Sequence, residues 1–146
     1  MKVSGARTVS ATPEALWAFL MDPSQLKACL PGCESLTAGG PNVFRARMKL
    51  GVAFLKGTYE GSLTVVDPQP NQQFALKVEG GGALGTLTAA GTVKLIATGS
   101  GSTYVLYDGQ AAVGGRIAAF GDRVVDATAT RLIGLFFDCV ASHVQE

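Results

Sequence analysis

The sequence is poor in charged residues and in histidine, and each shortage excludes a class of function. Only 16% of the 146 residues are charged, and the formal net charge is +1. This even balance gives no electrostatic basis for binding nucleic acid, which we therefore do not expect as a partner. His143 is the single histidine, and carboxylates fall on the polar sides of the predicted elements. No catalytic pair is predicted, and we expect no enzymatic activity.

Cysteine is also scarce, and the three cysteines are Cys29, Cys33 and Cys139. A zinc site would need more ligands at closer spacing, so no metal-ligating residue is predicted. Cys29 and Cys33 flank a Pro-Gly turn, and the alternative to inert thiols there is a redox pair. We predict that all three are reduced thiols that act as small apolar side chains, without redox or metal chemistry.

The sequence has no apolar run long enough to cross a bilayer. Residues 1–5 lead directly into a strand pattern, without the features of a signal peptide. We therefore expect a cytoplasmic protein.

Apolar residues and glycine are abundant instead. The mean hydropathy is +0.28, and there are 19 glycines without a regular period. Such an apolar excess indicates either a large core or an apolar surface that faces a ligand or a partner. The glycines are typical of hairpins and tightly curved strands. The length fits one domain that spans residues 1–146.

Two short helices are predicted after the first strand. Thr12 precedes Pro13, and Asp22 precedes Pro23. In each pair a side chain that caps helices is followed by proline, which is favoured at the first helical position.

Alternating apolar and polar residues then predict a series of strands. The expected strands cover residues 3–11, 35–38, 43–50, 54–66, 74–78, 84–97 and 105–113, with a loop at 67–71. Their short connections predict an antiparallel, sequentially ordered sheet. A single helix from about Arg116 to Val144, roughly 43 Å long, ends the chain. The order predicts an α+β fold in which a curved sheet of six to seven strands wraps around this helix.

A cavity is predicted between the sheet and the last helix. Gly121, Thr128 and Cys139 place small side chains at the centre of the helix's main apolar face, opposite glycine-rich strands. Unfilled volume is costly unless something occupies it. The residues predicted to bind a hydrophobic small molecule are Phe44, Met48, Tyr59, Leu76, Val78, Tyr107, Gly121, Val124, Thr128 and Leu132. The tyrosines are expected to be core residues with one hydroxyl partner or to hydrogen-bond a ligand carbonyl.

A second apolar row on the last helix contains Ile133, Phe137, Val140 and Val144. Four such side chains would form a sticky patch if they were left in water. We predict that the short helices cover most of the row through Trp17, Phe19 and Leu26. Any uncovered end is expected to contact a partner enzyme or a second copy of the chain in a homodimer.

Several motifs resemble the CoxG-like proteins associated with carbon monoxide dehydrogenase, a family of the START-like, SRPBCC or helix-grip superfamily. They are Trp17, Asp22-Pro23, Cys29-Leu30-Pro31-Gly32-Cys33-Glu34, Lys56–Gly61 and Val113–Ala118 followed by Phe120-Gly121. The resemblance covers nearly the whole chain and implies a helix-grip fold.

The resemblance also implies a role, as an accessory protein of a molybdenum-containing carbon monoxide dehydrogenase or a related hydroxylase. The expected ligand is a quinone or another lipid, with no resident cofactor. The chain stops at Glu146 without the low-complexity tail linked to membrane attachment, so membrane association is not expected. Two alternatives stay open, a polyketide cyclase or aromatase-like enzyme of the same superfamily, and an assembly factor with an incidental cavity.

Overall fold

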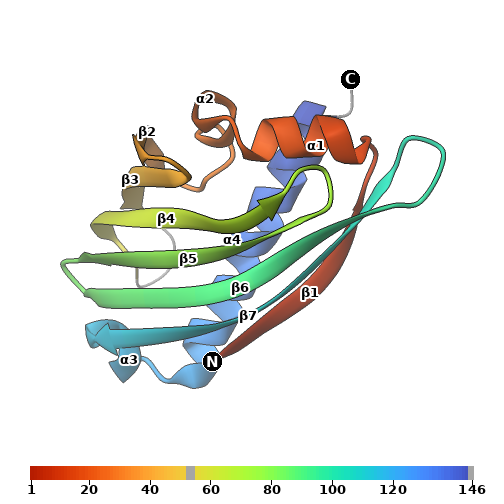
Figure 1. Cartoon of the computed structure of the whole chain (residues 1–146). Coiled ribbons are helices and arrows are strands. Elements are labelled where there is room, and N and C mark those ends of the chain that lie inside the picture. The colour runs from red at the N-terminus through yellow and green to blue at the C-terminus, as the bar shows by residue number, and fades with distance from the viewer. Residues whose placement is uncertain (52–54, 145–146) are drawn as a thin grey trace.

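The computed structural model describes residues 1–51 and 55–144. Figure 1 shows one curved sheet with a long C-terminal helix packed across one face and short helices at one end. The strands are β1 (Lys2–Val9), β2 (Cys33–Gly40), β3 (Val43–Leu50), β4 (Gly57–Gln69), β5 (Gln73–Gly82), β6 (Gly85–Ala97) and β7 (Thr103–Gly115). The helices are α1 (Pro13–Leu20), α2 (Pro23–Leu26), α3 (Arg116–Ala119) and α4 (Asp122–Val144).

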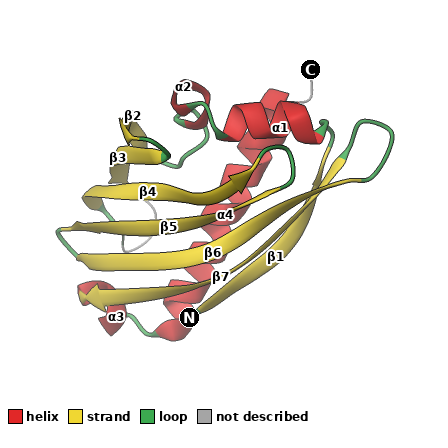
Figure 2. Cartoon of the chain, in the orientation of Figure 1, coloured by secondary structure: helices red, strands yellow, loops and turns green. Residues whose placement is uncertain are grey.

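The seven strands form one antiparallel sheet in the order β1-β7-β6-β5-β4-β3-β2. Strands β2 to β7 follow the chain as successive hairpins, and β1 adds to the free edge of β7. Figure 2 shows α1 and α2 at one end of this sheet and α4 crossing its length. The predicted α+β architecture, a curved antiparallel sheet around a C-terminal helix, is confirmed.

Glycines allow the sheet to bend where neighbouring strands approach closely. Gly61 lies opposite Gly80 across β4 and β5, and Gly91 lies opposite Gly109 across β6 and β7. A Cβ atom at Gly61 or Gly91 would collide with a backbone carbonyl oxygen of the neighbouring strand. Larger residues at these positions would push the strands apart, so the glycines permit the curvature that encloses α4.

Both short helices begin as the sequence predicts. Thr12 Oγ1 accepts a hydrogen bond from the Ala15 amide at 3.1 Å, at the start of α1. Asp22 Oδ1 accepts one from the Ser24 amide at 3.0 Å, at the start of α2. Each bond satisfies an amide that has no partner within its own helix.

Replacing Thr12 with alanine should lower the free energy of unfolding by about 1 kcal/mol, because the Ala15 amide loses its acceptor. Thr12→Ser keeps a hydroxyl oxygen in the same place and is the matched control, with stability close to that of the unchanged protein. Urea unfolding followed by circular dichroism measures both. Equal stability of the two variants would show that the cap contributes nothing.

The strand β4 runs further than predicted. It continues to Gln69 through part of the expected 67–71 loop. Asp67 has a positive φ of 49°, and the register with β5 shifts there. Prolines suggested a loop at this point, but a bulge accommodates proline inside a strand. The expected start of the strand at residue 54 lies outside the described residues, and β4 begins at Gly57.

The predicted single helix from Arg116 to Val144 is wrong, because the structure divides it into α3 and α4. Gly121 lies between them with a φ of +89°. Glycine adopts this left-handed conformation without a steric penalty, whereas a continuous helix cannot contain it. The 23 residues of α4 span about 34 Å, so the helix is shorter than expected. None of the described helices is both long and apolar enough to cross a membrane.

The second apolar row of the last helix is buried inside the protein, as predicted. Val140 is fully buried and Phe137 nearly so, and both belong to a core cluster with Phe19 of α1. Ile133, Val144 and Trp17 pack against this cluster from its edge. Leu26 instead belongs to a second cluster, with Phe44, Val65 and Phe74. The C-terminal half of α4 thus packs on the solid core at the α1 end of the sheet.

Candidate ligand-binding cavity

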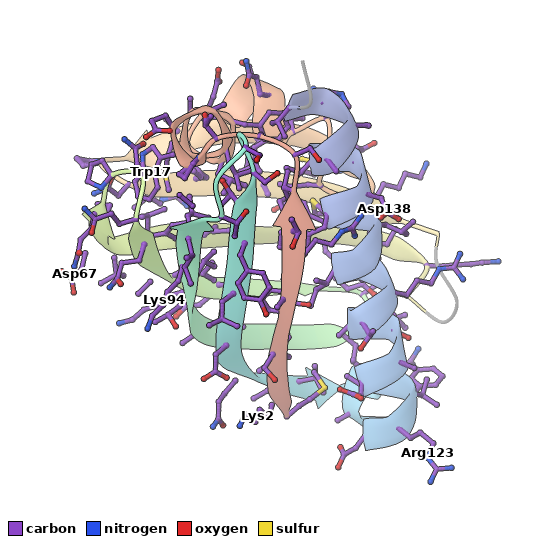
Figure 3. All side chains as sticks on the ribbon, turned by 90° about the vertical axis from the view of Figure 1, so that its right-hand side faces the viewer. Lys2, Trp17, Asp67, Lys94, Arg123 and Asp138 are labelled. Atoms are coloured by element: carbon purple, nitrogen blue, oxygen red, sulfur yellow. A yellow bond between two sulfur atoms is a disulfide. The ribbon has the colours of Figure 1, made fainter. Side chains whose placement is uncertain are left out.

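The N-terminal half of α4 faces a cavity of about 330 Å³ rather than a packed core. In Figure 3 the labelled Arg123 marks this end of α4, and Trp17 marks the opposite, core end of the molecule. The apolar lining residues come from α2 and its following turn, from the sheet, and from α3 and α4. They include Leu26, Leu30, Pro31, Leu36, Phe44, Ala46, Met48, Leu50, Leu55, Tyr59, Leu63, Val78, Leu87, Val113, Ile117, Val125, Ala129 and Leu132. A cavity of this size and character is in the range of small-molecule sites.

Six of the ten predicted ligand-binding residues line this cavity together. They are Phe44, Met48, Tyr59, Val78, Thr128 and Leu132. Four elements contribute them, namely β3, β4, β5 and α4. The prediction that inward strand residues face small residues of the helix across a cavity therefore holds for this set.

Leu76 and Tyr107 face the same side of the sheet but lie in the core. Leu76 packs against the cluster around Phe74, and the Tyr107 ring stacks on Phe137 with ring centroids 5.5 Å apart. Both sit nearer the α1 end of their strands than the cavity does. Their assignment as cavity residues is not supported by this placement.

Gly121 and Val124 also lie outside the cavity lining. Gly121 is the break before α4, and Val124 is 42% exposed on the outer side of that helix. Val125, the next residue, lines the cavity instead. The predicted helical face was wrong at this end because it was drawn as one helix through Gly121.

The sequence interpretation missed the wall formed by α2 and the turn that follows it. Leu26, Leu30 and Pro31 line the cavity from this segment. The spacing of Leu26 and Leu30 by four residues is a signal of one shared face. The sequence interpretation gave Leu26 only the covering of the second apolar row.

Tyr59 brings an unsatisfied polar atom into the cavity lining. Its hydroxyl oxygen is buried and has no hydrogen-bond partner among the described residues. Burial raises the pKa of this hydroxyl by disfavouring the phenolate. At neutral pH it is therefore a neutral donor without an acceptor, which is costly unless a bound molecule supplies one.

The other polar groups at the cavity have partners or lie outside. The Thr128 hydroxyl donates to the Val124 carbonyl oxygen at 2.9 Å within α4. Glu60 and Glu79 border the cavity, but both residues are exposed. Glu60 forms an ion pair with Arg47 at 3.0 Å. Tyr59 is thus the polar group of the lining best placed to orient a ligand.

The cysteines do not match their prediction. Cys29 and Cys139 form a disulfide with Cα atoms 5.3 Å apart, so they are not reduced thiols in this structure. Cys33 remains free, and burial raises the pKa of its thiol. His143, expected to be a solvated helix-end residue, is exposed but lies beside both bonded sulfurs. The pairing of residues 110 apart could not be read from the Cys29–Cys33 spacing.

The fold and the cavity together define a START-like, helix-grip protein. Residues 5–145 match the sequence profile of CoxG, described as a component of carbon monoxide dehydrogenase. The chain belongs to this family. Family and fold support a ligand-binding accessory role.

Solved structures of similar proteins agree with this fold. A conserved protein from Geobacillus kaustophilus is 33% identical, with a TM-score of 0.96 over 99% of this chain and 95% of its own. A START superfamily protein from Mycobacterium smegmatis is 15% identical, with a TM-score of 0.79 over 99% and 97%. The Zhui aromatase/cyclase from Streptomyces sp. R1128 is also 15% identical, with a TM-score of 0.73 over 99% and 93%. Among curated proteins, no significant sequence match was found.

Proposed function

We propose that this protein binds an elongated apolar molecule that carries a hydrogen-bond acceptor, such as a quinone or a lipid-like compound. The ligand occupies the cavity between the sheet and α4, and the protein does no chemistry on it. The observation that carries this proposal is an apolar lining with one buried, unpartnered donor, the Tyr59 hydroxyl. Such a lining selects an apolar body, and the hydroxyl orients a carbonyl or similar oxygen.

The energetics favour an occupant. At about 24 cal/mol per Å³, an empty apolar void of about 330 Å³ would cost on the order of 8 kcal/mol. This is comparable with the whole net stability of a small domain, which is about 5–15 kcal/mol. Water is a poor replacement, because the lining offers it few hydrogen-bond partners.

Family membership extends the proposal to a biological role. CoxG-like proteins accompany molybdenum-containing carbon monoxide dehydrogenases and related hydroxylases, and we place this chain beside such an enzyme in the cytoplasm. A bound quinone in this cavity would link the enzyme to an electron acceptor. No resident cofactor is part of the proposal, since the quinone is the ligand itself.

The direct test uses the purified full chain and the fluorescent hydrocarbon diphenylhexatriene, which emits in apolar surroundings. We expect saturable binding, and displacement by decylubiquinone and by 2-undecanone. An absence of binding, together with an unchanged melting temperature in the presence of these compounds, would show that the cavity is incidental to an assembly role. Turnover of a polyketide-like substrate would instead favour a cyclase.

Replacing Tyr59 with phenylalanine should weaken 2-undecanone binding by about three- to tenfold, the equivalent of one lost neutral hydrogen bond. The same variant should bind diphenylhexatriene as the unchanged protein does, since a hydrocarbon has no acceptor. Displacement titrations measure both affinities. Equal weakening of both compounds would mean that the ring packs on the ligand and the hydroxyl does not bind it.

A further inference from the structure

Two cysteines and the single histidine meet where the segment after α2 packs on the last turns of α4. Cys29 and Cys139 are bonded, and His143 Nδ1 lies 3.7 Å from Cys29 Sγ and 3.6 Å from Cys139 Sγ. Cys139 and His143 are four residues apart, so they share one face of the helix. This cluster is separate from the cavity lining and has no role in the proposed binding site.

The two sulfurs differ in their access to solvent. Cys29 is only 4% exposed and packs inside the main core cluster. Cys139 is half-buried at the edge of that cluster, and His143 is exposed. An external thiolate can therefore reach Cys139 Sγ more easily than Cys29 Sγ, which makes Cys29 the leaving sulfur.

His143 is placed to stabilise the thiolate that leaves. Its Nδ1 lies 2.9 Å from the Cys139 backbone carbonyl oxygen. Because a carbonyl oxygen only accepts hydrogen bonds, Nδ1 is the protonated nitrogen. The same N–H is within reach of the Cys29 sulfur, and a nearby donor of this kind favours a thiolate. A protonated Nδ1 cannot ligate a metal beside the sulfurs, so the geometry favours redox chemistry over a metal centre.

The disulfide also joins two walls of the cavity. Leu26, Leu30 and Pro31 line it from the segment that contains Cys29. Thr128 and Leu132 line it from the helix that contains Cys139. The covalent link holds these walls together, and its loss allows them to separate.

We propose that Cys29–Cys139 is a redox-active disulfide that low-molecular-weight thiols such as glutathione reduce, and that its reduction loosens the ligand cavity. The second half of this inference rests on the proposed function, and the first half does not. In the cytoplasm such thiols act against the disulfide continuously.

The reaction is an ordinary thiol–disulfide exchange. A glutathione thiolate attacks Cys139 Sγ, forms a mixed disulfide and releases Cys29 as a thiolate, which then takes up a proton. A second glutathione thiolate attacks the glutathione sulfur, and Cys139 leaves as a thiol after protonation. Two glutathione molecules are oxidised to one glutathione disulfide, and the two electrons reduce the protein. Once reduced, the Cys139 thiol can donate to the Ala28 carbonyl oxygen at 3.5 Å.

The test equilibrates the full chain with mixtures of reduced and oxidised glutathione, followed by rapid alkylation and mass spectrometry. We expect millimolar reduced glutathione to convert the pair to two alkylated thiols, and oxidised glutathione to restore the disulfide. His143→Ala should slow the reduction severalfold without unfolding the protein. A disulfide that resists reduction, or that never forms in the purified protein, would overturn the proposal. Stoichiometric zinc held by the reduced cysteines would also overturn it.

The link to the cavity is tested on the same samples with diphenylhexatriene. We expect release of the probe to be at least about three times faster from the reduced than from the oxidised protein. The double variant Cys29→Ser/Cys139→Ser should match the reduced protein in every buffer, and Cys33→Ser should match the unchanged protein. Identical release rates in both states would refute the loosening. If neither state binds the probe, the proposed function fails, and the alkylation result still decides the redox half.

Discussion

Replacing Phe137 with aspartate should lower the free energy of unfolding by at least about 3–5 kcal/mol. Phe137 is 9% exposed, stacks on Tyr107 and meets the edge of Phe136 with ring centroids 5.3 Å apart. Truncating a buried phenylalanine alone costs about that much, and burying a carboxylate among apolar side chains adds to the loss. Guanidinium unfolding, or the folded fraction where the variant is mostly unfolded, measures the effect.

Leu135→Asp is the matched control for this experiment. Leu135 lies two residues earlier on the same helix and is 44% exposed. An exposed substitution of this type usually changes stability by less than about 0.5 kcal/mol. If both variants are equally stable, the buried face of α4 has been assigned wrongly, and the row around Phe137 is a surface for a partner.

The sequence predicted which side of each strand faces inward, but not where along the strand the cavity begins. Alternation with a period of two identifies a face, and it placed Met48 and Tyr107 correctly on that face. It contains no information on the height of a residue relative to α4. Met48 therefore lines the cavity, while Tyr107 lies against Phe137 in the core.

The same limit explains the errors on the last helix. A period of 3.6 residues locates a face only within one continuous helix. Gly121 interrupts the chain with a positive φ, so the rotation of residues before it does not continue into α4. Thr128 and Leu132, well inside α4, were placed correctly, and Val124, near its start, was not.

The disulfide was outside the reach of local reasoning. Cys29 and Cys139 are 110 residues apart, and only the packing of α2 beside the end of α4 brings them together. The spacing of Cys29 and Cys33 directed attention to the wrong pair. The apolar character of Cys29 was predicted correctly, since it is buried in the core cluster.

The cavity itself gives the sharpest functional test, because Thr128 lies in its lining and only 9% of it is exposed. Thr128→Phe should reduce the affinity for diphenylhexatriene by at least about tenfold, since the added ring occupies the space of the ligand. The cost in stability should be modest, about 1–3 kcal/mol or less, because the ring enters a void and not a packed core. Fluorescence titration and thermal unfolding of the same samples give both quantities.

Val124→Phe separates blocking of the cavity from a general effect of a larger side chain on α4. Val124 lies one turn before Thr128 and is 42% exposed, outside the lining. We expect this variant to bind diphenylhexatriene as the unchanged protein does. Thr128→Phe should also weaken 2-undecanone and the hydrocarbon equally, whereas loss of the Tyr59 hydroxyl affects the ketone alone. If Thr128→Phe is folded and binds the probe normally, the ligand does not occupy the space beside α4, and another part of the cavity must hold it.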